Sequence, residues 1–429
     1  FAREVGELGA ARIISTHRAA RTGADLDALA ARLDALAEPC RDLVKVAPAA
    51  ETAAQGVELL RWLGQRDPGT TVAVSTGVPG SFTRLLAPAF GGALTFAAPA
   101  PVPGADLGLA APGQLSVDHV RAVWPGSGPS TGTDVALVCG DPIGHSAGPV
   151  VHGAALAVTG VDGVLAPTLA SPAEALGLGS RLLGLSVTAP YKVAAMGLVG
   201  EASSAARAIG ALNTIEVGAG GAERGSNSDA PAVRAALEAT GVDLRGAAAL
   251  VVGAGGAARA AVHALQEAGA SVTVAARRVE AAAALSGDRA VSLEALSDLD
   301  GEVPRVIVHA TPLGTEASGH APSATKPPGM ADRSEAPIPL ALLTPGVTVL
   351  DAVYRPRRTR LLRLAASRGA VTVEGAEWFL QQAWLQHLRI FRRGYAARYG
   401  ATGPPPAVVT AAKAAMARAL DAWLEGDAR

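Results

Sequence analysis

A glycine-rich turn near the middle of the chain limits the available folds more than any other feature. Segment 250–259 (LVVGAGGAAR) joins an apolar run to an alanine-rich run of helical character. Gly253 can adopt the dihedral angles of a tight turn, and Gly255 lets the backbone approach phosphates closely. A strand, a tight turn and a helix N-terminus in this order form the pyrophosphate site of an open α/β sheet. The residues expected along the dinucleotide are Gly253, Ala254, Gly255, Gly256 and Ala257.

Two arginines indicate which dinucleotide this sheet prefers. Residues 270–276 read as the second strand, and an NAD site places an acid at its end to bind the ribose hydroxyls. This chain has Arg277 and Arg278 there, and guanidinium groups suit a 2′-phosphate. Solvated surface arginines are the alternative. The position after the strand favours NADP.

Composition limits the class of protein. A chain of 429 residues with 49% hydrophobic residues predicts two to three domains with substantial cores. A net charge of −1 gives no sign of nucleic-acid or membrane-surface binding, and no segment reads as a signal peptide or membrane span. The two cysteines have neither metal nor disulfide spacing, so we expect no metal and a cytoplasmic location. Because the chain starts at Phe1, we expect a fragment of a longer polypeptide.

The first 123 residues read as repeated β-then-α units, which predict a parallel sheet. Between the β-like runs lie stretches with apolar residues at helical spacing, such as Leu26–Leu36. In a (β/α)8 barrel the carboxyl ends of such strands converge on the active site. The predicted strands are Arg12–Thr16, Leu43–Ala47, Thr71–Ser75 and Ala93–Ala97.

Lys45 is the informative residue of this region because it lies inside an apolar strand. Burial lowers the pKa of an amine and makes it a nucleophile toward carbonyl carbon. An edge-strand lysine that faces solvent is the alternative.

Four segments of this region resemble type I 3-dehydroquinate dehydratases: 15–17 (STH), 44–47 (VKVA), 82–88 (FTRLLAP) and 111–114 (APGQ). The resemblance implies that Lys45 forms a Schiff base and that His17 is the general acid and base. It also implies that Arg84 and Gln114 hold the substrate, whereas Ala110 replaces a serine that is usual in the family.

The resemblance covers the second half of the family's barrel only. We therefore expect residues 1–123 to form a half-barrel with an exposed edge and little or no dehydratase activity. Residues 124–133 are rich in Gly, Ser and Pro and read as a linker.

Beyond the linker, Asp134–Cys139 reads as a strand that leads into a loop of small residues. Exposed N–H groups and the Ser146 hydroxyl in this loop suit a carboxylate. His145 resembles a base, but no nucleophile pattern accompanies it, so a histidine that ties the loop is favoured.

Lys192 and Asp229 can serve the reduction of a ketone. Hydride transfer requires a proton for the developing alkoxide, and a lysine held by a carboxylate can deliver it. Asn213 and Thr188 can donate or accept hydrogen bonds with a polyol. Each residue alone is unremarkable, since an isolated Lys or Asp is usually solvated.

The order of these motifs, followed by the glycine turn, resembles shikimate dehydrogenases from about residue 134 to about residue 384. The resemblance implies that Lys192 and Asp229 are catalytic and that NADP is the cofactor. Shikimate would contact Ser146, Thr188, Asn213 and Asp229. The family has a second serine where this chain has Gly148, so a carboxylate contact is lost or is replaced by water or by the Gly148 N–H.

Arg305–Val308 reads as a strand that ends in segment 309–315. This strand end would lie near the cofactor, with Thr311 as a candidate contact. His309 and Thr315 replace the family's Asn and Met. Segment 351–362 matches the family pattern DxxYxPxxTxLL and places Tyr354 by the substrate, with a locally packed tyrosine as the alternative. The arginines at 355, 357, 358, 360 and 363 read as a solvated face.

Segment 374–383 resembles the family's closing helix. Gly375 would approach the nicotinamide, and Gln382 would bind shikimate. The alanine-rich helix at 404–424 packs on the body or on a partner, and the sequence leaves both open.

Together these features predict an α/β protein with five parts: a half-barrel at 1–123, a linker at 124–133, a substrate domain at 134–240, a Rossmann-like NADP domain at 241–372, and returning helices at 373–429. The predicted activity is NADP-dependent reduction of 3-dehydroshikimate to shikimate. The expected partners are small-molecule substrates, with no nucleic acid and no membrane, and a homo-oligomer stays open. Alternatives are an NAD-dependent quinate/shikimate dehydrogenase, a non-catalytic binding protein, and an N-terminal part that serves only structure or homo-oligomer assembly.

Overall fold

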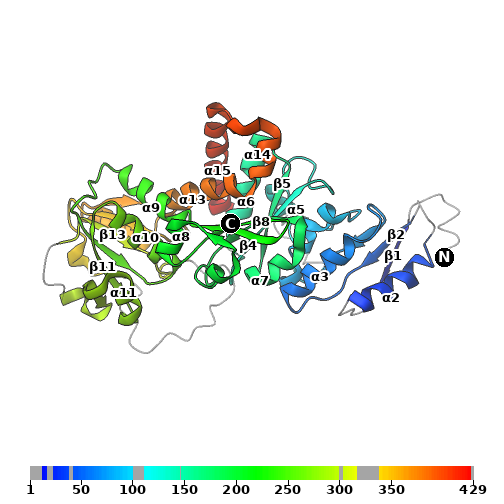
Figure 1. The fold of residues 1–429 in the computed structure, drawn as a ribbon, viewed down its shortest axis with the longest axis horizontal. Helices are drawn as coiled ribbons and strands as arrows, with labels where there is room; N and C mark the ends of the chain where they lie inside the picture. The colour runs from blue at the N-terminus through cyan, green and yellow to red at the C-terminus, as the bar shows by residue number, and fades with distance from the viewer. Residues whose placement is uncertain are drawn as a thin grey trace, which may run out of the picture.

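The computed structural model describes residues 12–16, 23–37, 42–99, 111–144, 146–298, 303–315 and 338–426. His17, Ala110 and His145 lie outside these residues. Figure 1 shows an elongated arrangement, with the N-terminal sheet at one end, the glycine-turn sheet at the other and the C-terminal helices over the middle.

The N-terminal sheet is parallel and has the order β1-β2-β3. Its strands and the longer helices beside them are β1 (Ile13–Thr16), α2 (Gly23–Asp34), β2 (Leu43–Val46), α3 (Ala53–Leu63) and β3 (Thr71–Ala73). Shorter helices follow: η1 (Val78–Gly80), α4 (Thr83–Leu86), η2 (Ala87–Phe90) and α5 (Val117–Val123). Lys45 therefore lies on the central strand, so the edge-strand alternative is wrong.

The predicted fourth strand at Ala93–Ala97 is wrong. Gly91 turns the chain with a φ of 88°, and the Ala93 N–H donates one hydrogen bond of 2.8 Å to the Thr71 carbonyl. The chain then leaves β3 and pairs again only as an isolated bridge between Ala98 and Ser116. Three strands with an unpaired β1 edge among the described residues make less than the expected four-stranded half-barrel.

The predicted linker at 124–133 is tied to the parts on both sides. Trp124 donates its indole N–H to the Leu85 carbonyl at 3.1 Å, and buried Thr133 donates to Asp162 at 2.8 Å. One buried apolar cluster also runs from Leu60 and Leu86 into the following sheet at Val164. The N-terminal part thus shares a core with the part that follows it.

The second sheet is mixed, with the order β5-β4-β6-β8-β9-β7. Strands β5, β4 and β6 are parallel, whereas β8 is antiparallel to both β6 and β9. The strands are β4 (Asp134–Cys139), β5 (Gly163–Thr168), β6 (Leu182–Val187), β7 (Glu201–Ala202), β8 (Thr214–Gly218) and β9 (Gly221–Ser226). The helices are α6 (Gly148–Thr159), α7 (Pro172–Ala175), η3 (Leu176–Arg181), η4 (Ala194–Leu198) and α8 (Ser204–Ile209).

The third sheet is parallel throughout, with the order β12-β11-β10-β13-β14-β15. Its central strands are apolar because helices cover both faces. The strands are β10 (Ala248–Val252), β11 (Ser271–Ala276), β12 (Ala290–Ser292), β13 (Val306–His309), β14 (Thr348–Asp351) and β15 (Val371–Val373). The helices are α9 (Asp229–Glu238), α10 (Gly256–Glu267), α11 (Val279–Ser286), η5 (Gly287–Arg289), η6 (Glu294–Asp298), η7 (Leu340–Leu342) and α12 (Arg360–Ser367).

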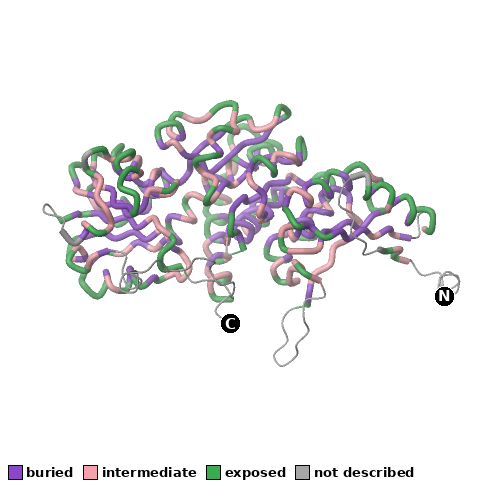
Figure 2. Tube along the Cα trace, turned by 90° about the horizontal axis from the view of Figure 1, so that it is seen from below, coloured by how far each residue is buried: buried purple, intermediate pink, exposed green. Residues whose placement is uncertain are grey.

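The C-terminal helices return to the second sheet, and their bounds are α13 (Gly375–Ile390), α14 (Arg392–Tyr399), η8 (Gly400–Thr402) and α15 (Pro406–Gly426). Helix α15 packs on the body, because Met416 and Leu420 are buried with Val151 of α6 and Trp384 of α13. Figure 2 shows buried stretches running through this central region as well as through both flanking parts. No described helix is long and apolar enough to span a bilayer.

Candidate active site

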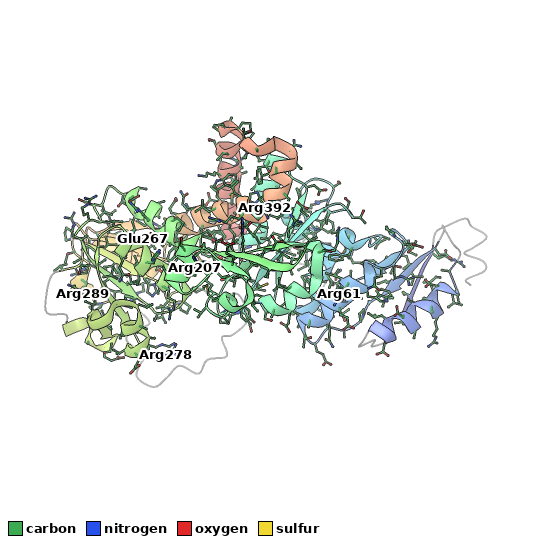
Figure 3. All side chains as sticks on the ribbon, in the orientation of Figure 1. Arg61, Arg207, Glu267, Arg278, Arg289 and Arg392 are labelled. Carbon is green, nitrogen blue, oxygen red and sulfur yellow. The ribbon has the colours of Figure 1, made fainter. Side chains whose placement is uncertain are left out.

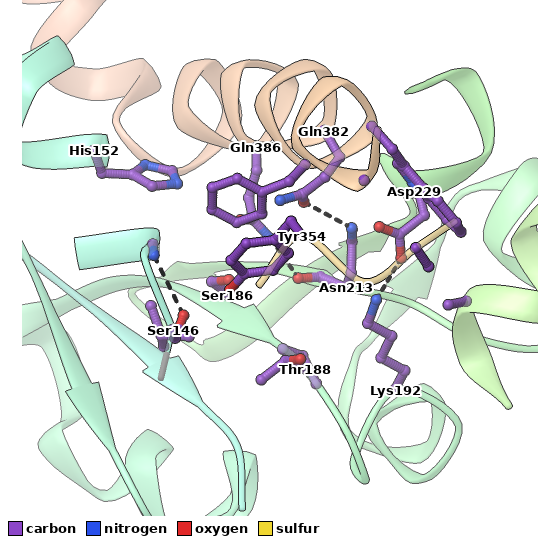
Figure 4. Close-up of a pocket in the computed structure, with 18 residues that line it drawn as sticks. Ser146, His152, Ser186, Thr188, Lys192, Asn213, Asp229, Tyr354, Gln382 and Gln386 are labelled. Carbon is purple, nitrogen blue, oxygen red and sulfur yellow. Dashed lines mark hydrogen bonds and ion pairs between the residues drawn. The ribbon is translucent and has the colours of Figure 1, made fainter. Parts of the chain in front are cut away.

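Lys192 and Asp229 meet between the second and third sheets. Lys192 lies in the turn after β6, and Asp229 is the first residue of α9. The Lys192 Nζ lies 2.6 Å from Oδ2 of Asp229, and both side chains are largely buried (Figure 4). The side-chain Oδ1 of Asn227 accepts the N–H groups of Asp229 and Ala230, at 2.9 and 3.2 Å. This Asn227 contact fixes the start of α9, and it was not predicted.

A cavity of about 200 Å³ opens beside this pair. It brings together the predicted substrate residues, which come from separate parts of the chain: Ser146, Thr188, Asn213, Asp229, Tyr354 and Gln382. His152, Ser186 and Gln386 also line it and were missed. The spacing of Gly148 and His152 on one helix face is the signal that could have found His152.

Amide groups at one wall are oriented by each other. The Asn213 Nδ2 donates to Ser228 at 2.9 Å and to Gln382 Oε1 at 3.3 Å, and the Ser228 N–H returns a hydrogen bond of 2.9 Å to Asn213 Oδ1. Gln386 donates to the Asn213 carbonyl at 2.6 Å. Hydrogen-bonded amides of this kind hold fixed donors and acceptors toward a polyol.

Tyr354 both packs locally and lines the cavity. Its ring stacks on Phe379 with centroids 4.7 Å apart, and its hydroxyl accepts the Ala147 N–H at 3.5 Å. Burial raises the pKa of Tyr354, so the phenol keeps its proton. The local packing of Tyr354 is therefore observed together with a position at the cavity wall, and its contact with a substrate stays a prediction.

A second cavity of about 680 Å³ follows the glycine turn and shares Ser146, Thr188, Lys192 and Tyr354 with the first. The turn residues at its wall are Ala254, Gly255, Gly256 and Ala257. Gly253 makes the turn itself, with a φ of 125°, and a Cβ there would lie 2.7 Å from the Ala310 carbonyl oxygen. A Cβ at Gly256 would lie 2.8 Å from that of Lys192, so the turn and the lysine are in direct contact.

Comparison with known proteins identifies the family. A model of the shikimate dehydrogenase substrate binding domain matches residues 138–215, and a type I 3-dehydroquinase model matches residues 3–127. A shikimate dehydrogenase (NADP(+)) of Halobacterium salinarum is 42% identical over 256 residues, which cover 58% of this chain and 90% of that protein. The chain belongs to the shikimate dehydrogenase family.

Two further proteins are similar to this chain. A bifunctional, chloroplastic 3-dehydroquinate dehydratase/shikimate dehydrogenase of Arabidopsis thaliana is 31% identical over 398 residues, which cover 87% of this chain and 62% of that protein. The crystal structure of shikimate 5-dehydrogenase from Thermus thermophilus in complex with NADP(H) and shikimate is 31% identical. It has a TM-score of 0.51 and covers 66% of this chain and 99% of that one.

The two arginines after β11 of this dehydrogenase differ in position. Arg278, labelled in Figure 3, lines the second cavity. Arg277 is exposed and is not among the residues of that cavity wall. Arg259 and Arg355 line the same cavity and were not predicted to do so. Arg277 and Arg278 could be found from the sequence because they follow the second strand after the glycine turn. No local signal identifies Arg259 or Arg355.

The solvated-face interpretation of the arginines after Tyr354 is wrong for Arg355 and Arg357, whereas Arg358, Arg360 and Arg363 are exposed as predicted. The Arg355 guanidinium lies 5.0 Å from the centre of the Trp423 ring, in contact with α15. Arg357 donates to Glu374 at 2.6 Å and also pairs with Asp421 of α15, and Arg358 lies 3.7 Å from Glu374. Helix α15 thus clamps the segment that carries Tyr354.

Gly375 lies at the wall of the first cavity, at the start of α13. A Cβ there would lie 2.6 Å from the carbonyl oxygens of both Asp351 and Val353, so only glycine lets the helix approach the end of β14. The structure places Gly375 at the smaller cavity that holds Asn213 and Gln382, and not among the residues of the larger one.

His309 is fully buried and orients Thr311, which lines the larger cavity together with Thr315. Its Nδ1 lies 2.8 Å from Asp351 Oδ1, and its Nε2 lies 2.5 Å from Thr311 Oγ1. His309, which replaces the family's Asn, therefore helps to hold the Thr311 side chain in place.

In the N-terminal part, the Lys45 ammonium lies 4.2 Å from the centre of the Phe96 ring. Burial, and then the charge of Arg84, lower the pKa of Lys45. Arg84 is 2% exposed, and its Nε makes no hydrogen bond among the described residues; the same holds for the Gln114 Oε1. The roles of Lys45, Arg84 and Gln114 toward a substrate stay predictions, and His17 lies outside the described residues.

Proposed function

We propose that the chain catalyses the reversible NADP-dependent reduction of 3-dehydroshikimate to shikimate. The observation that carries this proposal is the Lys192–Asp229 pair at 2.6 Å, because Lys192 lines both cavities. A ketone bound in the smaller cavity thus lies between a proton donor and the nucleotide site.

The residues of the smaller cavity take separate roles in this proposal. Lys192 gives its proton to the carbonyl oxygen as negative charge develops on it, and takes the proton back in the reverse direction. Asp229 accepts a hydrogen bond from Nζ and keeps the ammonium aimed at that oxygen. Asn213, Thr188 and Gln382 hold the ring hydroxyls, and Ser146 holds the carboxylate. NADPH, when bound along the glycine turn, supplies the hydride.

The absorbance of reduced nicotinamide tests the activity. With shikimate and NADP offered together we expect absorbance to rise, and with NAD at equal concentration we expect a slower rise, because Arg278 suits a 2′-phosphate. An equal or faster rate with NAD would favour the quinate/shikimate alternative. No rise with either nucleotide would favour a binding protein.

For the N-terminal part we propose structural support without turnover of 3-dehydroquinate. The shared apolar core and the 2.6 Å hydrogen bond from Arg181 to the Ala89 carbonyl support this role. We also propose that the chain divides at the boundaries predicted from its sequence, with a substrate domain at 134–240 and an NADP domain at 241–372.

Borohydride trapping tests the N-terminal part. We expect no reduced 3-dehydroquinate adduct on Lys45, because the three-stranded sheet among the described residues does not close a barrel around its amine. The measurement is the intact mass after treatment, and Lys45→Ala is the matched control. A mass increase that the variant lacks would show that Schiff-base chemistry survives in this chain.

A further inference from the structure

A pair of buried histidines extends from the substrate cavity into the core. His152 lies on α6 and lines the cavity, and His387 lies on α13 behind it. Their Nδ1 atoms are 3.1 Å apart, and His387 Nε2 lies 2.9 Å from the Tyr395 hydroxyl. His152 is 1% exposed and His387 is fully buried. The roles proposed above for hydride and proton transfer involve neither imidazole ring.

Both rings are neutral. Burial lowers the pKa of His152 to about 3, and burial together with the neighbouring His152 lowers the pKa of His387 well below its ordinary value. A neutral imidazole has one N–H and one bare nitrogen. His387 therefore donates on one side and accepts on the other, which links the state of His152 to the state of Tyr395.

Tyr395 determines the direction of this chain of hydrogen bonds. Burial raises its pKa to about 12, so the phenol keeps its proton, while a side-chain hydrogen bond with Thr159 opposes that rise. A phenol O–H is a stronger donor than a neutral imidazole N–H, and a bare imidazole nitrogen is a stronger acceptor than a phenol oxygen. The phenol proton therefore goes to His387 Nε2, 2.9 Å away. His387 then carries its proton on Nδ1 and donates it to His152 Nδ1.

His152 consequently carries its proton on Nε2. This atom makes no hydrogen bond to any residue that the structure describes, while the ring forms part of the cavity wall. Figure 4 shows His152 at the same end of the cavity as Ser146, away from Lys192 and Asp229. An N–H donor without a protein partner at this end points to an anionic or carbonyl acceptor on the ligand.

Gly148 has no side chain that could bind a ligand at the end of the cavity where His152 lies. Gly148 and His152 are one helical turn apart on the same face of α6. The Gly148 N–H is directed to Ser146 Oγ at 3.3 Å, so it is already engaged. A Cβ at residue 148 would lie 3.3 Å from the same Ser146 Oγ, so the glycine leaves space next to that hydroxyl.

We propose that the Nε2–H of His152, fixed by His387 and Tyr395, binds the substrate carboxylate together with the Ser146 hydroxyl. This inference rests on the proposed function, since it assigns the carboxylate to the end of the cavity opposite Lys192. His152 is then a specificity residue for acids over uncharged analogues, and His387 is the residue that sets its tautomer.

Shikimate and its methyl ester, used as substrates, test this assignment. The ester keeps the reacting hydroxyl but lacks the negative charge. A hydrogen bond to a charged group contributes about 1.5–3 kcal/mol, so His152→Phe should raise KM for shikimate about 10- to 100-fold. We expect kcat and KM for NADP to change little, and the preference for acid over ester to fall by the same factor. His152→Gln, which restores an N–H donor, should recover part of the preference.

If His152 had a structural role only, His152→Phe would raise KM for shikimate and for its methyl ester by the same factor. That result would overturn the assignment. His387→Phe removes the donor to His152 Nδ1 while filling the space, and should lower the acid preference with less effect than His152→Phe. Preserved acid preference in His152→Phe would also overturn the proposal.

Nitrogen-15 NMR of the unmodified protein separates this inference from the proposed function. We expect His152 to show the Nε2–H tautomer between pH 6 and 8. An Nδ1–H tautomer would overturn the inference even if shikimate is turned over. If the unmodified protein fails to oxidise shikimate, the proposed function fails by itself, and the tautomer is still measured.

Discussion

Lys192→Met is expected to lower kcat for shikimate oxidation by about 10²- to 10⁴-fold, which is the usual contribution of a general acid or base. Methionine keeps much of the side-chain length but has no proton to transfer. Since the ring hydroxyls retain Asn213, Thr188 and Gln382, we expect KM for shikimate to rise much less than kcat falls. Steady-state rates with NADP at saturating concentration measure both constants.

Two matched variants accompany this measurement. Asp229→Asn keeps the shape of the partner but removes the charge that lies 2.6 Å from Nζ, so kcat should fall as well. Lys413→Met replaces an exposed lysine of α15 and should leave both constants unchanged. Unchanged kcat in Lys192→Met would refute the catalytic pair and support a binding protein of this fold.

Arg278→Ala is expected to raise KM for NADP about 10- to 100-fold, because a charge-assisted hydrogen bond to phosphate contributes about 1.5–3 kcal/mol. The rate with NAD should change little, since NAD has no 2′-phosphate. The ratio of kcat/KM for the two nucleotides is the quantity to measure.

Arg277→Ala is the control for that experiment. Arg277 precedes Arg278 and is also exposed, but it is not part of the cavity wall, so its loss should raise KM for NADP less. A larger effect for Arg277→Ala, or an equal loss with both nucleotides in Arg278→Ala, would contradict the assignment of the 2′-phosphate to Arg278.

Local sequence was sufficient where a single segment carries the pattern. The apolar run before Gly253 forms β10, and the alanine-rich run after Gly255 forms α10, because strand, turn and helix are determined by residues close together in the chain. The same holds for Asp134–Cys139, which is β4. The resemblance to two families also depended on short motifs, and both family matches cover parts of the chain that carried those motifs.

The sequence was misread where the structure of a segment, or the surroundings of a side chain, depend on residues far along the chain. Ala93–Ala97 has the composition of a strand, but it makes a single backbone bond to β3 before the chain moves away. The arginines after Tyr354 read as solvated because their partners, Glu374, Asp421 and Trp423, lie far along the chain. Pairing at such distances leaves no trace in local composition.

The glycine turn, the kinds of residue expected at the site and most helices and strands could be predicted from the order of the amino acids alone. Which side chains meet became known from the folded chain: Lys192 with Asp229, Arg357 with α15, and His152 with His387, 235 residues away. The physical reason is that secondary structure follows from neighbours within a few residues, whereas a cavity wall is assembled from strand ends and helices that sheet topology brings together.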